Sequence, residues 1–166
     1  MRKTILIVLT CFVYWSSFAQ TVYKEIPSER LNSVRKLKIK LPKDYDPNSE
    51  IKHPLIIVFD ADYLFEPVAG QVDFQTYFDD MPSSIVVGIL QGEEREFDSF
   101  YDALTGLPSD SGFMFHEFVS TELLPYLDKK YNTSKFRVGV GHDVMGSFIN
   151  SFLFKPAPAF QAYVCL

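Results

Sequence analysis

The chain has 166 residues, of which 47% are hydrophobic and 16% aromatic, and its formal net charge is −5. This composition excludes an intrinsically disordered chain, because enough apolar surface is available to form a core. The acidic balance argues against nucleic-acid binding, which needs clustered Lys and Arg to release counterions from phosphates.

The first 20 residues predict a secretory signal peptide. Arg2 and Lys3 precede an apolar stretch that ends in small residues, Ser17-Phe18-Ala19, before Gln20. The apolar run is shorter than the ~20 residues that span a bilayer, so we expect no stable membrane insertion after cleavage. The sequence therefore predicts export to the periplasm or the extracellular space. Cleavage would leave 14 basic and 21 acidic residues, a net charge of −7.

The remaining residues, 21–166, are predicted to form one domain without a disulfide, because Cys11 leaves with the signal and Cys165 stays alone. Residues 34–41 alternate apolar and basic side chains, which predicts a half-buried strand near a sheet edge. Residues 54–60 and 83–90 are continuous β-branched and aromatic runs. Such runs are typical of strands covered on both faces, as in parallel sheets.

Longer segments separate these strands. Residues 60–81 predict one helix or two short ones, and residues 91–111 form a polar stretch longer than an ordinary loop, which indicates function or mobility. Residues 112–131 predict an amphipathic helix that Ser111 could cap and that Pro125 must disturb. His116 and Glu122 on this helix are interpreted as structural.

A third buried strand is predicted at residues 136–142, followed by a helix over 143–154 and the start of a fourth strand at 160–166. Buried strands alternating with helices predict an α/β fold with a doubly wound, mostly parallel sheet, preceded by one or two antiparallel strands. In such sheets ligands bind outside the carboxyl ends of the strands. The segments DADY, QGEERE and GHDVMG are expected to meet there.

Four segments together resemble the putative esterase family of the α/β hydrolases, related to esterase D and the enterochelin esterases. They are RKLKIKLPKDYD, HPLIIVFDADYLF, FHEFVSTELLPYLDKKYNT and FRVGVGHDVMGSF, and the similarity runs from about Ser28 to the last residue. The resemblance implies an α/β-hydrolase fold that hydrolyses carboxylic, thio- or siderophore esters of small molecules with a Ser-His-Asp triad and no cofactor. The last of the four segments would be the nucleophile elbow, a strained turn from strand to helix.

The sequence departs from the family pattern at three points. Asp143 stands where the family has the catalytic serine, and Met145 where it has the last glycine of the elbow. Ala61 replaces a glycine after the second strand, at a position that could require glycine's conformational freedom. The triad acid and histidine follow the elbow in the family, so the domain is expected to be incomplete at its C-terminus, as a fragment or a frameshifted gene product.

Asp143 therefore allows several interpretations. It could be the N-cap of the following helix, a relic of a catalytic position, or a carboxylate nucleophile as in the dehalogenases and epoxide hydrolases that this Gly-His-Asp turn resembles. Ser147 is a weaker substitute, one helical turn further on. If the family geometry holds, the oxyanion donors are the backbone N–H groups of Val144 and of Ala61 or Asp62.

Other polar residues are assigned more simply. Arg95 and Asp98 could orient a polar substrate, or could form an exposed ion pair with each other. His142 is expected to pack beside the sheet and His53 to face water. No metal site is predicted, because the three histidines, His53, His116 and His142, are scattered.

The predicted function is therefore that of a carboxylic ester hydrolase whose activity in this chain is lost or impaired, since the serine and the downstream acid and histidine are missing. The alternative is a non-catalytic ligand-binding or interaction module on the same fold. An incomplete sheet would also leave an unpaired apolar edge, which favours self-association.

Overall fold

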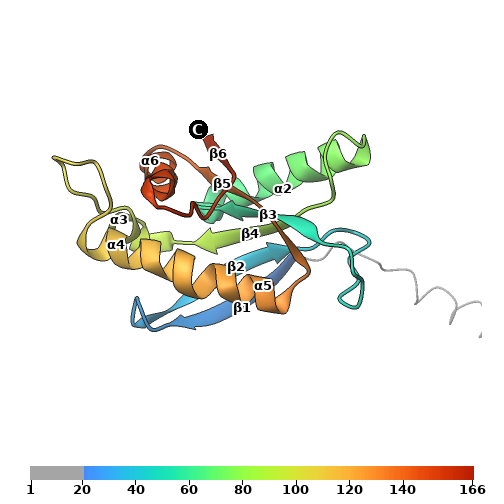
Figure 1. Cartoon of the computed structure of the whole chain (residues 1–166), viewed down its shortest axis with the longest axis horizontal. Helices are drawn as coiled ribbons and strands as arrows, with labels where there is room; N and C mark the ends of the chain where they lie inside the picture. The colour runs from blue at the N-terminus through green and yellow to red at the C-terminus, as the bar shows by residue number, and fades with distance from the viewer. Residues whose placement is uncertain (1–20) are drawn as a thin grey trace, which may run out of the picture.

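Helices cover both faces of a six-stranded sheet in the computed structural model, which describes residues 21–166 (Figure 1). The predicted signal peptide lies outside the described residues. The strands are arranged in the order β1-β2-β4-β3-β5-β6. Their bounds are β1 Thr21–Ser28, β2 Ser33–Lys40, β3 His53–Val58, β4 Ile85–Leu90, β5 Thr133–Gly141 and β6 Ala162–Cys165.

The sheet is mixed, as the sequence predicts. β1 pairs antiparallel with β2 and β2 with β4, whereas β4, β3, β5 and β6 pair in parallel. All four strands predicted from apolar runs are present, and β3 and β4 are largely buried, as continuous apolar runs predict. The burial predicted for the fourth strand was wrong, because β6 is an edge strand whose residues are half-buried or exposed. β1 was not predicted individually. Three exposed residues interrupt its pattern and it contains Pro27, which an edge strand tolerates because no ladder hydrogen bond is lost there.

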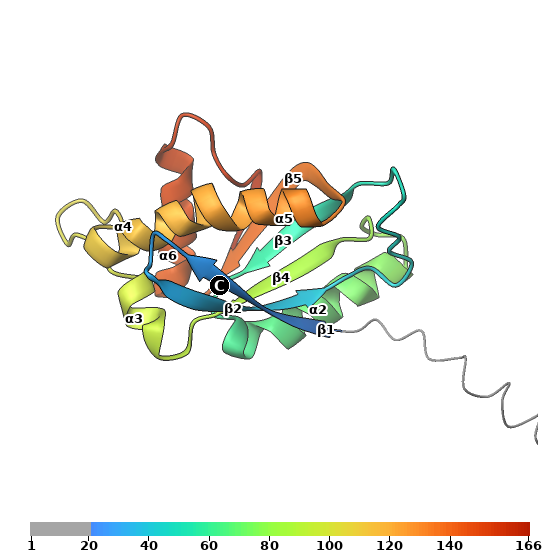
Figure 2. The ribbon, with the colours of Figure 1, turned by 90° about the horizontal axis from the view of Figure 1, so that it is seen from below.

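Neighbouring residues of β3 face two separate cores. Leu55 and Ile57 face a large core under α4 (Asp110–Glu117), η3 (Phe118–Leu123), α5 (Leu124–Lys130), α6 (Val144–Asn150) and η4 (Ser151–Phe154). Ile56 and Val58 face a smaller core under α2 (Ala61–Tyr77). Figure 2 shows these two layers on opposite sides of the sheet. No helix within residues 21–166 is long and apolar enough to cross a membrane.

Three of the four basic side chains of β2 are paired with carboxylates, whereas Lys36 is exposed. Lys38 and Lys40 pair with Glu66 and Asp73 of α2, while Arg35 lies buried on the opposite face. The alternating pattern therefore marks the strand correctly but does not show that α2 covers its polar face.

Glu122 joins the long helical segment to the hairpin between β1 and β2. Its carboxylate accepts hydrogen bonds from the Ser28 hydroxyl at 2.6 Å and from the N–H groups of Glu29 and Arg30 at 3.1 Å. This confirms a structural role. Pro125 is accommodated because the preceding turn, η3, is a π-helix, which re-spaces the backbone hydrogen bonds ahead of the proline.

His116 has the predicted structural role, but the assignments of two other residues were wrong. The ring of His116 stacks on Phe152 at 3.8 Å, and burial lowers its pKa to about 4. His53 is buried rather than exposed to water, and its Nδ1 lies 2.9 Å from the Ser83 carbonyl. Ser111 does not cap the helix. The N-cap position is Ser109, and the Ser111 hydroxyl donates to the Phe97 carbonyl.

The β6 edge is short and uncharged. β6 has the sequence AYVC, and Val164 and the following Leu166 are 41% and 58% exposed. Protein edges that avoid pairing with other chains usually carry charges, prolines or bulges. β6 has none of these devices within its four residues.

We therefore expect the chain to self-associate through β6 in a concentration-dependent way. Val164→Lys should weaken this association because it places a charge on the edge. Val34→Lys, which alters a similarly exposed valine near the β1–β2 turn, is the matched control and should not weaken it. Sedimentation equilibrium over a range of concentrations measures both effects. A wild-type chain that stays monomeric throughout contradicts the expectation.

Candidate functional site

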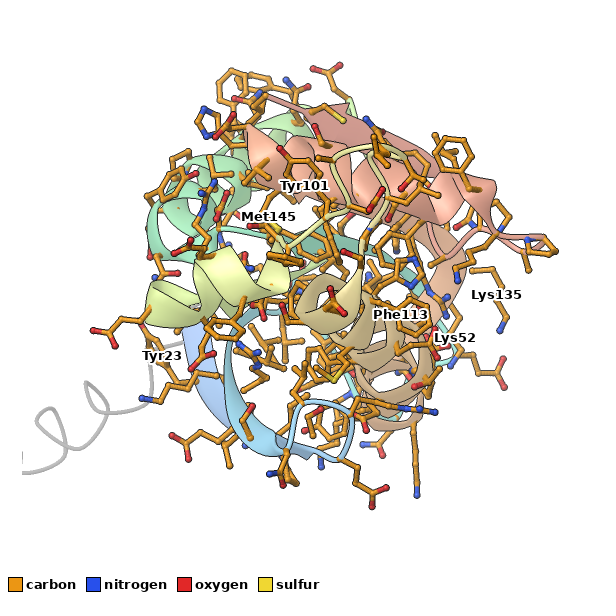
Figure 3. The ribbon with its side chains drawn as sticks, turned by 90° about the vertical axis from the view of Figure 1, so that its left-hand side faces the viewer. Tyr23, Lys52, Tyr101, Phe113, Lys135 and Met145 are labelled. Atoms are coloured by element: carbon orange, nitrogen blue, oxygen red, sulfur yellow. The ribbon has the colours of Figure 1, made fainter. Side chains whose placement is uncertain are left out.

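The carboxyl ends of β3, β4 and β5 meet at one edge of the sheet, as predicted. Val58 is in register with Gly88 of β4 and with Val140 of β5, so the residues that follow each strand are brought close together. Asp60 follows β3, Gln91 follows β4, and Asp143 stands between β5 and α6. Figure 3 looks at this end of the molecule, with Tyr101 and Met145 labelled.

Asp143 is the apex of a strained strand-to-helix turn. Its backbone lies at φ 54° and ψ −121°, a conformation that is unfavourable for a residue with a side chain. The Asp143 N–H donates to the Leu166 carbonyl at 2.9 Å, and the Leu166 N–H donates to the Gly141 carbonyl at 3.0 Å. Gly141 is required because a Cβ there would lie 2.6 Å from the Met145 carbonyl oxygen. This is the geometry expected of a nucleophile elbow.

The Asp143 side chain does not cap α6. Asp143 occupies the N-cap position, but its carboxylate accepts no hydrogen bond from the helix. The interpretation of this residue as a stabilising N-cap is therefore wrong. Instead, the exposed side chain lines a cleft of about 320 Å³.

The cleft combines hydroxyl groups with apolar walls. Ser99, Tyr101 and Ser147 supply hydroxyls, and Pro108 and Phe148 supply apolar surface. Ser147 is thus brought into the same cleft as Asp143, one turn further along α6. No histidine of the described range, residues 21–166, lines the cleft.

Only one of the three predicted oxyanion donors lies in this cleft. Val144 lines it, and its N–H donates to no acceptor within residues 21–166. Ala61 is completely buried, so its N–H cannot reach a ligand, and Asp62 is exposed on α2 outside the cleft lining. The positive φ also belongs to Asp60, at 54°, and not to Ala61. Alanine at position 61 therefore causes no backbone strain.

Arg95 pairs with Asp60 and not with Asp98. Its Nε and Nη2 donate to the buried Asp60 carboxylate at 2.6 and 3.1 Å, and this contact raises the pKa of the guanidinium. The Tyr63 hydroxyl donates to the same carboxylate at 3.0 Å and lies 3.1 Å from Nδ1 of His142. Burial, followed by the hydrogen bond to Asp60, raises the pKa of Tyr63. His142 is thus held towards α2, on exposed surface outside the cleft lining.

Asp98 lies in the protein interior. Arg35 binds its carboxylate through two hydrogen bonds of 2.7 and 3.2 Å, and Gln91 donates to it at 3.0 Å. Burial raises the pKa of Asp98 to about 6, although Arg35 and Gln91 both favour the charged form. The alternative of an exposed ion pair between Arg95 and Asp98 is therefore wrong. Neither residue lines the cleft, so the structure gives no contact that would orient a substrate there.

Gln91 connects these groups and was missed by the sequence analysis. Its side-chain oxygen accepts from the Asp60 N–H at 2.8 Å, and its amide nitrogen lies 3.7 Å from the sulfur of Met145. Its own N–H donates to Asp62 at 2.9 Å. Gln91 therefore links the turn after β3 to the elbow helix. The only signal in the sequence was a polar residue directly after a buried strand.

No cluster of three or more His, Cys, Asp or Glu residues that could hold a metal ion occurs within the part of the chain that the structure describes. The chemistry that the site can perform therefore depends on its backbone geometry and on the hydroxyl and carboxylate groups of the cleft.

A sequence profile gives a family match. Residues 28–149 match the family described as "Putative esterase". No curated protein sequence matches the chain.

Several solved structures share the fold of this chain. A protein of uncharacterised function from Capnocytophaga ochracea is 32% identical, with a TM-score of 0.78 over 86% of this chain and 39% of its own. An IroE-like serine hydrolase from Shewanella oneidensis is 23% identical, with a TM-score of 0.73 over 87% of this chain and 49% of its own. The ferric enterobactin esterase of Salmonella typhimurium is 19% identical, with a TM-score of 0.67 over 89% of this chain and 36% of its own. The chain thus spans half or less of each of these proteins.

The raised pKa of Asp98 predicts an unusual pH dependence. The folded chain holds this proton more tightly than the unfolded chain, whose carboxyl titrates near ~4. The contribution to stability is therefore fully present below about pH 4 and is lost as the pH rises through about 6. Asp98→Asn should remove this dependence, on the order of 3 kcal/mol between pH 4 and 7.

Urea denaturation of the wild type and the variant at several pH values measures the difference. Asp79→Asn, at an exposed carboxylate after α2, is the control and should run parallel to the wild type. If the Asp98→Asn curve is also parallel to the wild type, the assignment of the proton to Asp98 is incorrect.

Proposed function

Because the chain belongs to the "Putative esterase" family of hydrolases, we propose that it carries the elbow and one oxyanion donor of an exported carboxylic ester hydrolase acting on small-molecule esters. The observation that supports this best is the strained turn at Asp143, which places residues 143 and 144 side by side in the lining of one cleft. An elbow serves to present a nucleophile beside an oxyanion donor. No cofactor is needed for such chemistry.

Aspartate at the apex changes what the cleft can do. A carboxylate that adds to an ester carbonyl forms a tetrahedral intermediate with two possible leaving groups, the carboxylate and the alkoxide. The carboxylate is the better leaving group, so the intermediate returns to the starting ester. A carboxylate beside the Val144 N–H also repels the negative charge that ester hydrolysis develops on the oxyanion. We therefore propose that this chain hydrolyses esters weakly or not at all.

The positions of the histidines support the same proposal. A serine or a water molecule needs a base within hydrogen-bonding distance to become a nucleophile. His53 and His116 are buried, and His142 is held by Tyr63 outside the cleft lining. Residues 21–166 thus bring no imidazole to the cleft.

The second candidate function is binding of a ligand without catalysis. It is favoured by the same carboxylate, since Asp143 is exposed in a cleft with hydroxyl and aromatic walls and forms no salt bridge within residues 21–166. A cleft of this volume lies at the lower end of the range of ~300–1,000 Å³ for small-molecule sites.

A chimera tests the first proposal. Residues 28–149, with Asp143 or with Asp143→Ser, would replace the structurally equivalent part of the Shewanella hydrolase. The serine form should hydrolyse 4-nitrophenyl acetate at least about 1,000-fold faster than the aspartate form, because only the serine can complete a triad. The chain alone should be silent with either residue.

Circular dichroism and thermal unfolding would show whether both chimeras fold. A folded serine chimera that is as inactive as the aspartate chimera would show that these residues do not supply a working elbow. Substantial turnover by the chain with Asp143 would instead show that this carboxylate is itself catalytic.

A further inference from the structure

We propose that the cleft at the elbow binds a small organic ammonium ion, with the Asp143 carboxylate as its counter-charge and Tyr101 as its aromatic wall. This deepens the second candidate function, because it uses the same cleft and names a class of ligand for it. It does not require that the chain hydrolyse an ester.

The charge of the cleft favours a cation. Among residues 21–166, Asp143 is the only carboxylate that lines the cleft, and no Lys, Arg or His of this range lines it. Of the other aspartates at this edge, Asp60 pairs with Arg95, Asp98 pairs with Arg35, and Asp62 accepts hydrogen bonds from the Gln91 and Gly92 N–H groups outside the cleft lining. The negative charge of Asp143 is therefore available to a ligand, and an anionic ligand would be repelled.

The walls of the cleft favour an organic cation over an inorganic one. Tyr101 is 53% exposed, and Pro108 and Phe148 add apolar surface. Ammonium groups are attracted to the faces of aromatic rings, and methylated ammonium groups also gain from apolar contact. A hard metal ion usually binds several carboxylate or carbonyl oxygens, and only one side chain of the described lining is a carboxylate.

The wall that carries Tyr101 is ordered by its own hydrogen bonds. Tyr101 and Pro108 form an antiparallel bridge across the loop. Asp102 accepts from the N–H groups of Leu104 and Thr105 at 3.1 and 2.9 Å. The loop is thus held in place before a ligand arrives, so binding requires little additional ordering.

The backbone strain at Asp143 agrees with a functional role for its side chain. The residue stays in an unfavourable conformation, and within residues 21–166 its carboxylate accepts no capping hydrogen bond from α6 and forms no salt bridge. Residues strained in this way are concentrated at ligand sites and active sites. Each contact with an exposed carboxylate or ring is weak, so we expect millimolar affinity for the simplest ammonium ligands.

Choline and its neutral isostere 3,3-dimethylbutan-1-ol provide a matched pair of probes. Titration of the ¹⁵N-labelled chain should give chemical-shift changes at Asp143, Val144 and Tyr101 that saturate with choline. The neutral alcohol should bind at least about 10-fold more weakly, because it has the same shape but no charge. Added salt should weaken choline binding, since the pair is exposed.

Variants test whether choline binds at the cleft or is attracted only by the net negative charge of the protein. Asp143→Asn should weaken choline binding at least about 10-fold while leaving the fold intact, since within residues 21–166 the carboxylate neither caps α6 nor forms a salt bridge. Asp79→Asn removes the same charge after the C-terminal end of α2, which lies away from α3 (Arg95–Asp98) and α6 (Figure 1), and should leave binding unchanged. Tyr101→Phe should retain binding, and Tyr101→Leu should lose several-fold.

Three results would overturn the proposal: equal binding of choline and the neutral alcohol, equal losses for Asp143→Asn and Asp79→Asn, or no shift changes at the cleft in a folded chain. None of them depends on ester hydrolysis. A chimera that hydrolyses nitrophenyl acetate while choline fails to bind the chain would remove this inference and leave the proposed family chemistry in place. The opposite pair of results would remove the chemistry and leave the binding site.

Discussion

The site depends on one backbone constraint, the close approach of Gly141 to the first turn of α6. A side chain at position 141 would lie 2.6 Å from the Met145 carbonyl, so only glycine allows α6 to begin directly above the end of β5. The chain has to reverse within two residues, and the strain of that reversal falls on Asp143. Strain of this kind costs roughly 1–3 kcal/mol and persists only where the surroundings fix the backbone. Here Leu166, the residue that follows β6, does so: its N–H donates to the Gly141 carbonyl and its carbonyl accepts from the Asp143 N–H.

A network of polar side chains connects the segments that follow β3 and β4 at the same edge of the sheet. Gln91 accepts from the Asp60 N–H and donates to Asp98, while Arg35 and Arg95 each pair with one of these two aspartates. Such a network is stable only when its members satisfy one another, since an unpaired buried charge is strongly unfavourable. It therefore fixes the relative positions of β3, β4 and α3, and it leaves these charged groups unavailable to a ligand in the cleft.

The sequence predicted the parts of the fold that follow from local patterns. Continuous apolar runs located β3, β4, β5 and β6, and the Gly-His-Asp turn located the elbow. Contacts between residues that are far apart in the sequence were not predicted. Arg35 lies 63 residues from Asp98, and Ser83 lies 30 residues from His53, so neither contact leaves a local pattern. Backbone strain was expected at Ala61, whereas the positive φ belongs to Asp60. A motif indicates that a turn is present, but it does not fix which residue of the turn has the strained backbone.

Asp143 separates two properties of an elbow that are usually found together. The position of the apex is set by Gly141, Met145 and Leu166, through backbone contacts that do not involve the side chain of residue 143. The chemistry of the apex is set by that side chain alone. Replacing a hydroxyl by a carboxylate therefore preserves the geometry of the cleft but reverses the charge that it stabilises, from a developing anion to a cation. Because these backbone contacts do not require a serine, the elbow keeps its geometry with a carboxylate at the apex, which is the arrangement on which the proposed cation site rests.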